Sequence, residues 1–170
     1  MTTTDDRTPA APARVLYTVT ATAEGGRQGR ARSDDGALDV PLAAPRAMGG
    51  PGGTGTNPEQ LFAAGYAACF GSAVEAIARR RRIDAGAVRV TARVAIGLLE
   101  GGAFGLAVEL QIVLPGVDGE TAEALVREAH AVCPYSNATR GNVPVALTVV
   151  DDRAAPSSAP PEKRSTGAPR

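Results

Sequence analysis

Cysteine, histidine and lysine are scarce in this chain of 170 residues. It has two cysteines, Cys69 and Cys133, a single histidine, His130, and a single lysine, Lys163. Two thiols and one imidazole do not supply the spaced ligand set of a zinc site. Two cysteines are also too few for a scaffold held together by disulfides. We therefore expect no metal site and no disulfide framework.

An excess of charge of either sign is also missing. The 18 basic residues balance the 18 acidic residues, so the formal net charge is zero. Nucleic acids and anionic membranes bind proteins that carry excess positive charge, so neither is expected as the main partner. The densest basic run, residues 79–82, closes a predicted helix, where cations suit the negative end of the helix dipole. A solvated helix end is therefore favoured over a nucleic-acid site.

Long apolar segments are absent as well. Residues 1–13 lack the apolar region of a secretory signal. The uncharged run over residues 61–74 is shorter than the roughly 20 apolar residues that span a bilayer. We expect a cytoplasmic protein with no membrane partner. In that compartment a disulfide is transient and serves catalysis or sensing.

What the chain does contain is a compositionally distinct middle. Hydrophobic residues make up 44% of the sequence, enough for one globular domain. Residues 1–13 and 151–170 are rich in proline, alanine, serine or threonine and lack periodicity, so both are predicted to be disordered tails. The folded domain is predicted to cover residues 14–150.

The first third of this domain has the alternation and turns of short strands. Three strands are predicted, over residues 15–20, 27–33 and 37–42, separated by turns rich in glycine and aspartate. The segment "MGGPGGTGTNPEQ" follows. It lacks the terminal Gly-Lys-Ser/Thr of a phosphate-binding loop, so it is interpreted as a packing loop.

A long apolar helix is predicted over residues 58–81. Thr56 or Asn57 can cap it, and Pro58 suits its first position. The helix is apolar on all faces as far as Val74, so it should be buried all round. One small domain has little material to cover a helix on every side. We therefore expect a second subunit to cover one face, as an obligate dimer.

The remaining segments complete an α+β fold. Alternating segments over residues 88–96 and 106–114 predict an antiparallel hairpin. Apolar spacing over residues 118–132 predicts a surface helix that Pro134 ends, and residues 143–150 form a last strand. The order β-β-β-α-β-β-α-β predicts antiparallel sheets with a buried central helix.

The two cysteines allow several interpretations. Cys69, in its apolar surroundings, is most simply a small buried hydrophobe. A reactive Cys69 must ionise, which apolar surroundings oppose and a cation within about 4–6 Å favours. Cys133 either has no role or acts as a resolving thiol, in which case its Cα atom must lie within about 7 Å of that of Cys69. His130 could activate a cysteine, but nothing in the sequence orients it.

Four segments together resemble a known family. They are "LYTVTATAEGGRQGRA", "GGPGGTGTNPEQLFAAGYAACF", "GGAFGLAVEL" and "AHAVCPYSNATRGN". They closely resemble the organic hydroperoxide resistance family, a branch of the OsmC-like superfamily, over about residues 14–150. The resemblance implies an OsmC-like fold, an intertwined homodimer with two active sites at the subunit interface, and a thiol peroxidase that prefers organic hydroperoxides.

The resemblance also assigns roles to residues. Cys69 matches the peroxidatic cysteine, whose sulfenic acid forms a disulfide with the resolving Cys133. Arg27 matches the catalytic arginine, and Glu59 matches the glutamate that holds it. The family is regenerated by lipoylated proteins of dehydrogenase complexes through dihydrolipoamide, with no bound cofactor. The apolar side chains that we expect to favour an alkyl tail are Phe62, Phe70, Phe104 and Tyr135.

Helix geometry adds one expectation about Glu59. It lies ten residues before Cys69 on one predicted helix, or roughly 15 Å along the axis. We therefore predict that Glu59, with Arg27, serves the partner's Cys69, so that each site is composite. Two alternatives stay open: a redox-sensing or hydrophobic-ligand module that oxidises without turnover, and a general OsmC-like peroxidase.

Overall fold

The computed structural model describes residues 11–152, which fall into two compact units that divide between Asn57 and Pro58. The predicted tails, residues 1–13 and 151–170, lie almost wholly outside the described residues. The single domain over residues 14–150 stays a prediction.

The first unit is a small antiparallel sheet with strand order β1-β2-β3. Two short 3-10 helices, η1 and η2, accompany it. Gly25 and Gly26, with φ angles of 71° and 55°, make the turn that leads from β1 into η1. The elements are β1 Ala21–Glu24, η1 Gly26–Gln28, β2 Arg30–Ser33, β3 Asp39–Pro41 and η2 Arg46–Met48.

The strand predicted over residues 15–20 is wrong, because β1 begins only at Ala21. Leu16 and Tyr17 are 84% and 76% exposed. Alternating β-branched and apolar residues favour extended backbone, but a strand also needs a partner for its N–H and C=O groups. In this sheet Ala21 already pairs with Ser33, the last residue of β2. No partner residues of β2 remain for the segment before Ala21.

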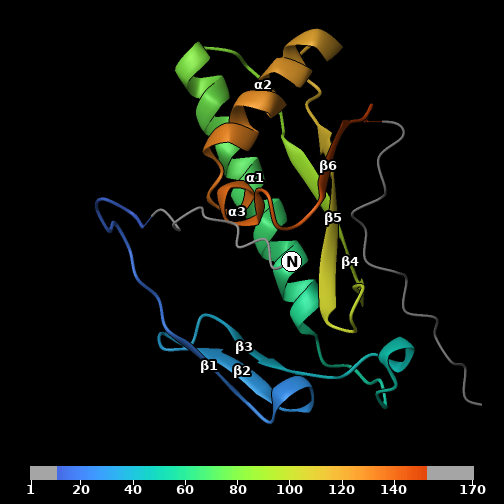
Figure 1. The fold of residues 1–170 in the computed structure, drawn as a ribbon. Coiled ribbons are helices and arrows are strands. Elements are labelled where there is room, and N and C mark those ends of the chain that lie inside the picture. The colour runs from blue at the N-terminus through green and yellow to red at the C-terminus, as the bar shows by residue number, and fades with distance from the viewer. Residues whose placement is uncertain (1–10, 153–170) are drawn as a thin grey trace, which may run out of the picture. The chain divides into compact units, whose positions relative to one another are not determined.

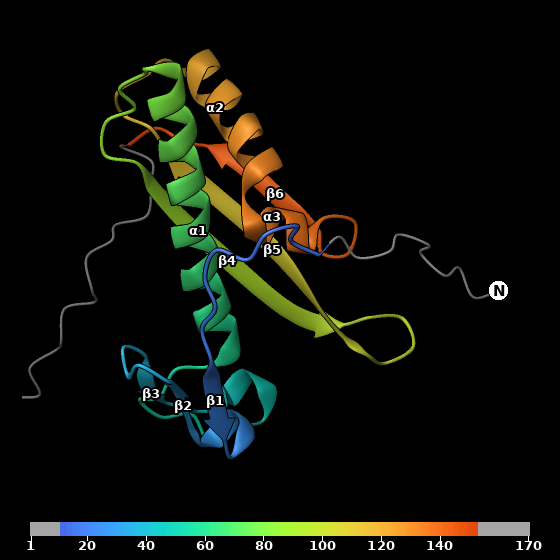
Figure 2. The same ribbon diagram turned by 90° about the vertical axis from the view of Figure 1, so that its left-hand side faces the viewer.

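The second unit packs helices against a three-stranded sheet of order β4-β5-β6. Figures 1 and 2 show α1 and α2 side by side on one face of this sheet. The bounds are α1 Pro58–Arg81, β4 Arg89–Leu98, β5 Phe104–Val113, α2 Gly119–Val132, α3 Pro134–Thr139 and β6 Val145–Val149.

The α+β class and the element order are confirmed, with α3 as an additional short helix. One strand pair differs from expectation. Strands β4 and β5 are antiparallel, but β6 runs parallel to β5, with Val108 opposite Val145 and Ile112 opposite Val149. The reason is the connection: α2 and α3 carry the chain back along the sheet before β6 begins, which is the crossover that a parallel pair requires.

The core of this unit lies between α1, α2 and β5. Its largest fully buried apolar side chains come from all three elements: Tyr66, Phe70, Val74, Leu110, Ile112 and Leu125. The α1 members recur every four residues, so they share one face of the helix. On the other face Ala64, Ala68 and Ser72 are exposed. Within one chain, the expected burial of α1 therefore holds for one face only.

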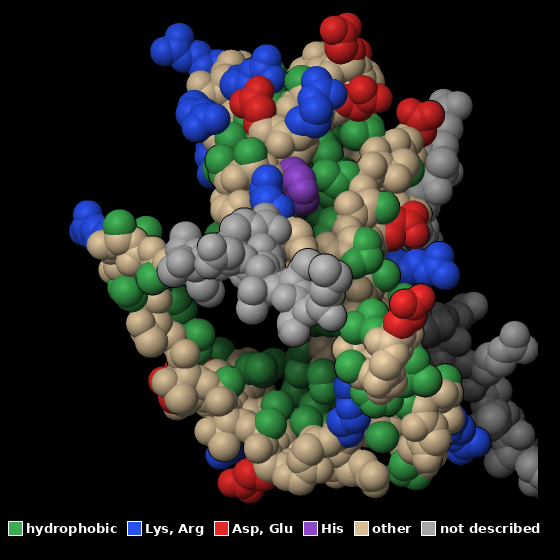
Figure 3. Space-filling model, viewed as in Figure 1, with side chains coloured by type: hydrophobic (Ala, Val, Ile, Leu, Met, Phe, Trp, Pro, Cys, Tyr) green, Lys and Arg blue, Asp and Glu red, His purple; other side chains and the backbone are tan. Residues whose placement is uncertain are grey.

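Helix α1 is also the one helix in residues 11–152 that is long and apolar enough to cross a bilayer by length and composition alone, with a mean hydropathy of 1.5. It packs against β4, α2 and α3, as the core helix of a compact unit does. Its last turn is charged: Arg80 and Arg81 both approach Glu128 of α2, at 3.7 and 3.1 Å. Figure 3 shows basic and acidic side chains gathered at the top of the view, where α1 ends and α2 begins in Figure 1.

Candidate redox site

The site is a pair of thiols that α1 and α3 bring together. Cys133 Sγ lies 3.6 Å from Cys69 Sγ, although the two residues are 64 positions apart in sequence. Both cysteines are free; Cys69 is half-buried and Cys133 is fully buried. A disulfide requires a sulfur separation of about 2.05 Å. The structure therefore holds a reduced dithiol in contact.

The position of Cys133 follows from its local sequence. Helix α2 ends at Val132, and Cys133 adopts an extended backbone with φ −62° and ψ 124°. Pro134 then occupies the first turn of α3, because its fixed φ suits a helix start as well as a helix stop. Pro134 thus ends α2 as predicted. The short helix α3 that begins at the same proline was not predicted.

An aromatic cluster joins α1, which carries Cys69, to α3, which follows Cys133. The rings of Phe62 and Tyr135 stack with centroids 6.0 Å apart, and Tyr66 lies 5.9 Å from Phe62 and 5.6 Å from Tyr135. Gly65 leaves room for this arrangement, because a Cβ atom there would lie 3.0 Å from the Tyr135 hydroxyl oxygen. The missing side chain lets Tyr135 pack closely onto α1.

Hydroxyl groups join α3 to α1 beneath the rings. The hydroxyl of the buried Tyr66 lies 3.0 Å from Ser136 Oγ and 3.2 Å from Thr139 Oγ1. Ser136 and Thr139 are themselves buried. Thr139 Oγ1 also donates to the carbonyl oxygen of Tyr135 at 2.9 Å. The polar groups of α3 are thereby satisfied inside the core.

The electrostatics around Cys69 oppose its ionisation. Burial raises the pKa of the Cys69 thiol, the backbone N–H of Tyr135 has a smaller lowering effect, and Cys133 raises the pKa further. With these neighbours alone, Cys69 is mainly a neutral thiol at pH 7. Burial, followed by the positive charge of Arg140, lowers the pKa of His130, whose ring packs 6.5 Å from that of Phe70.

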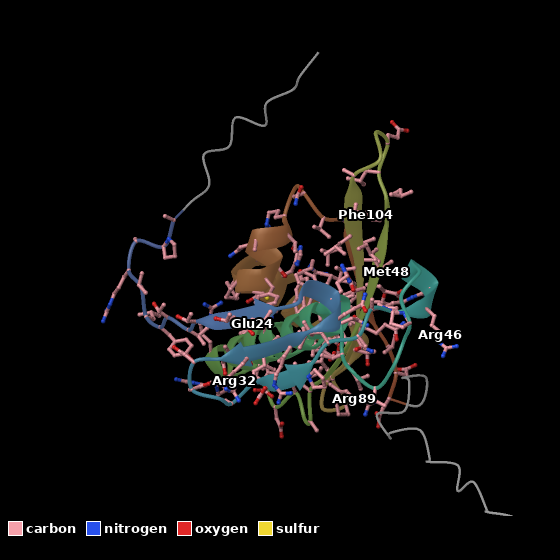
Figure 4. All side chains as sticks on the ribbon, turned by 90° about the horizontal axis from the view of Figure 1, so that it is seen from below. Glu24, Arg32, Arg46, Met48, Arg89 and Phe104 are labelled. Carbon is pink, nitrogen blue, oxygen red and sulfur yellow. The ribbon has the colours of Figure 1, made fainter. Side chains whose placement is uncertain are left out.

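Of the four side chains expected around the substrate, the structure brings two together. Phe62 and Tyr135 belong to the aromatic cluster. Phe70 is fully buried in the core. Phe104 is 67% exposed at the start of β5, opposite Leu98 and towards the turn of the β4–β5 hairpin (Figure 4).

Tyr66 was not among the residues predicted for the site. A signal existed, because Phe62, Tyr66 and Cys69 are spaced by four and three residues along one helix, the spacing that places side chains on one face.

The remaining predicted residues lie on defined elements. Arg27 is the middle residue of η1 in the first unit, and Glu59 lies in the first turn of α1. Glu59 and Cys69 both lie on α1. Their predicted separation of roughly 15 Å along the helix axis assumed this shared helix. Among residues 11–152, no group of three or more His, Cys, Asp or Glu side chains is arranged to hold a metal ion.

The sequence that forms this fold and its thiol pair matches a known protein family. The family model for OsmC-like protein matches residues 50–148. The organic hydroperoxide resistance protein of Xanthomonas axonopodis pv. citri is 57% identical over 141 residues, which cover 82% of this chain and 99% of the relative. The organic hydroperoxide resistance protein OhrB of Bacillus subtilis is 48% identical over 133 residues, covering 78% and 96%.

Solved structures agree with the sequence relatives. The crystal structure of an organic hydroperoxide resistance protein from Legionella pneumophila superposes with a TM-score of 0.77 at 50% identity, covering 80% of this chain and 98% of that one. The chain therefore belongs to the OsmC-like family, in its organic hydroperoxide resistance branch.

Proposed function

We propose that this protein is a thiol peroxidase that reduces alkyl and fatty-acid hydroperoxides to alcohols and so defends the cell against oxidative stress. The relatives just described carry the name of organic hydroperoxide resistance. The observation that carries the proposal is the 3.6 Å contact between a half-buried sulfur and a fully buried one.

In the first step the Cys69 thiolate attacks the terminal oxygen of the hydroperoxide. A sulfur–oxygen bond forms and the oxygen–oxygen bond breaks. The alkoxide takes a proton and leaves as the alcohol, and Cys69 becomes a sulfenic acid. Cys69 suits this role better than Cys133 because it is the more exposed of the two.

In the second step the sulfur of Cys133 attacks the sulfur of the sulfenic acid. A disulfide forms, and the hydroxyl group leaves with a proton as water. The two sulfurs start 3.6 Å apart, so they need to approach by only about 1.5 Å to reach disulfide length.

In the third step a dithiol reductant restores the pair. One thiolate of dihydrolipoamide attacks the protein disulfide and releases one cysteine as a thiolate. Its second thiol then attacks the resulting mixed disulfide and releases the other cysteine, and the thiolates take up protons. Both cysteines return to thiols, and the lipoyl group leaves as a cyclic disulfide. We propose a lipoylated protein of a dehydrogenase complex as the donor, no bound cofactor, and the cytoplasm as the compartment.

The first step needs a cation, because burial raises the pKa of Cys69. We assign this role to Arg27, oriented by Glu59. A guanidinium favours the thiolate and the negative charge that develops on the peroxide oxygens. We further propose a homodimer in which Glu59 serves the partner's site. The exposed small residues on the outer face of α1, among them Ala64 and Ala68, leave a helix face for a second subunit to cover.

Substrate preference would follow from the aromatic cluster. Phe62 and Tyr135 stack on each other, on the helix that carries Cys69 and the helix that follows Cys133, and we propose that their rings favour an alkyl tail by apolar burial. Hydrogen peroxide has no such tail. Phe70 and Phe104 stay predicted substrate contacts, although the structure places Phe70 in the core and Phe104 at the hairpin.

The test is turnover of cumene hydroperoxide with dihydrolipoamide as reductant. We expect many turnovers per chain, none in Cys69→Ser, and in Cys133→Ser a sulfenic acid that forms without forming the intramolecular disulfide. One oxidation per chain without turnover would instead indicate a redox sensor. Equal rates with hydrogen peroxide would indicate a general OsmC-like peroxidase.

A further inference from the structure

The three buried hydroxyls of Tyr66, Ser136 and Thr139 form a directed chain. Each hydroxyl has one proton to donate. Thr139 gives its proton to the backbone carbonyls of α3: that of Tyr135 is the nearer acceptor at 2.9 Å, and that of Ser136 lies at 3.3 Å. Tyr66 must therefore donate to Thr139, and Ser136 must donate to Tyr66. The hydrogen bonds run from Ser136 to Tyr66, from Tyr66 to Thr139 and from Thr139 to the Tyr135 carbonyl. Each of the three hydroxyl protons makes one hydrogen bond.

The series of hydroxyl hydrogen bonds ends at Tyr135, whose backbone also lies near Cys69. The carbonyl of Tyr135 accepts the last hydrogen bond of this series, and the backbone of the same residue lies near enough to Cys69 to lower the pKa of its thiol. Cys133 lies two residues earlier, where its carbonyl accepts the N–H of Asn137 in the first turn of α3. Any movement of this turn therefore changes both the N–H contact to Cys69 and the position of Cys133.

Two kinds of contact hold helix α3 against α1: the Tyr135 ring packs on Phe62 and Tyr66, and the hydroxyls of α3 meet that of Tyr66. Helix α3 has six residues, and isolated helices of that length are unstable in water. Its two buried residues are the hydroxyl-bearing Ser136 and Thr139, so the polar contacts with Tyr66 form the buried part of its attachment to α1. A buried hydroxyl that loses its partner costs about 1–3 kcal/mol.

We infer that Tyr66 is a positioning residue: through Thr139 and the Tyr135 carbonyl, its hydroxyl fixes the first turn of α3 and thereby the reactivity of both thiols. This inference rests on the proposed function, since it explains how the dithiol is kept ready for disulfide formation. Tyr66 does not touch the substrate or the reacting atoms in this role.

The first measurement is the pH dependence of Cys69 alkylation by iodoacetamide, with Cys133→Ser as the parent. Tyr66→Phe keeps the ring and removes only the hydroxyl. We expect it to raise the pKa of Cys69, because the backbone N–H of Tyr135, which lowers that pKa, loses its fixed position. Thr139→Val should act in the same way, and Thr139→Ser, which keeps the hydroxyl, should titrate like the parent.

The second measurement is the equilibrium of the intact dithiol with glutathione and its disulfide. Protein disulfide forms as one oxidised glutathione is reduced to two thiols, so the equilibrium constant reports how well the two cysteines are held together. We expect Tyr66→Phe and Thr139→Val to lower that constant about tenfold, and Thr139→Ser to leave it unchanged.

Thr121→Val is the matched control, because it deletes a hydroxyl that is hydrogen-bonded to Asp118 at the other end of α2. It should change neither value. The inference is overturned if Tyr66→Phe, still folded, keeps both the pKa and the equilibrium constant of its parent and shows only a lower melting temperature. Neither assay contains a hydroperoxide, so a wild-type protein without peroxidase turnover would refute the proposed function separately.

Discussion

At the residue scale, Cys69 combines a reactive type of side chain with surroundings that suppress its reactivity. Desolvation raises the pKa of its thiol, and the N–H of Tyr135 compensates only in part. A peroxidatic cysteine in this position depends on a positive charge brought to it. Arg27 is the residue that we assign to this task.

We expect Arg27→Gln to raise the pKa of Cys69 by about 1–3 units in the Cys133→Ser background. The sign follows because a cation favours the thiolate, so its removal favours the neutral thiol. Alkylation rates measured from pH 6 to 10 would give the value. Arg32→Gln is the control, since the Arg32 side chain pairs with Asp39 on the neighbouring strand. An unchanged pKa in Arg27→Gln would remove the proposed activation of Cys69.

Two glycines of α1 provide a matched pair for testing the aromatic cluster. A Cβ atom at Gly65 would lie 3.0 Å from the Tyr135 hydroxyl, whereas one at Gly71 would meet Val90 at an ordinary 3.6 Å. We expect Gly71→Ala to stabilise the protein by about 0.5–1 kcal/mol, as alanine does in a helix interior. Gly65→Ala should lose part of that gain, because the Tyr135 ring must move.

The same displacement should raise the KM for cumene hydroperoxide several-fold in Gly65→Ala and leave it unchanged in Gly71→Ala. Denaturant unfolding and steady-state kinetics on the two variants measure both effects. Identical KM values would mean that the position of the Tyr135 ring does not control substrate binding.

At the scale of elements, the first sheet has a pH-sensitive contact. Arg30 and Arg32 of β2 hold the pKa of Asp39 on β3 at about 2. Because the folded pKa is below the unfolded value near 3.9, this contact stabilises the sheet above about pH 4 and is lost as pH falls through 2. We expect an NMR titration of the Asp39 carboxyl carbon with a midpoint near 2, and a higher midpoint in Arg30→Gln. A midpoint near 3.9 in the wild type would contradict the pairing.

Sequence reasoning located elements well where several signals coincide. Helix α1 has the predicted bounds because a capping residue, Pro58 and an apolar run all agree. The prediction was incomplete where one residue marks two boundaries: Pro134 stops α2 and is also the first residue of α3. It also failed where tertiary pairing decides. Residues 15–20 have strand-like alternation, but in the described part of the chain they join no strand ladder beyond the one bond from the Asp34 N–H to the Thr20 carbonyl. The direction of β6 depends on the path of α2 and α3.

For the site, the sequence could nominate both cysteines but not their separation, since 64 residues of chain lie between them. It could not reveal Tyr66, whose hydroxyl has a function only once Ser136 and Thr139 fold against it. Contacts between buried hydroxyls of residues far apart in the sequence leave no repeating pattern in the sequence from which they could be predicted.

At the scale of the whole molecule, the proposed composite site predicts complementation between subunits. Glu59 lies ten residues before Cys69 on α1, about 15 Å along its axis. Homodimers of Glu59→Ala and of Cys69→Ser should each be nearly inactive. Mixed dimers should regain one working site, made of Cys69 from the first subunit and Glu59 from the second.

Refolding the two variants together and measuring cumene hydroperoxide turnover provides the test, with either variant refolded alone as the control. Activity near one quarter of wild type is expected for random mixing, since about half of the dimers are mixed and each has one of two sites. No recovery would mean that Glu59 serves the Cys69 of its own chain.

The sequence distance between the two cysteines also has a consequence during synthesis of the protein on the ribosome. A ribosome that adds about 5–20 residues per second completes Cys69 about 3–13 s before it reaches Cys133, 64 residues later. During that interval the nascent chain carries a solitary thiol that other molecules can capture. Cys69 can form an intramolecular disulfide only after the C-terminal third, which contains Cys133, has been synthesised. Until then an oxidised Cys69 can form disulfides only with other molecules.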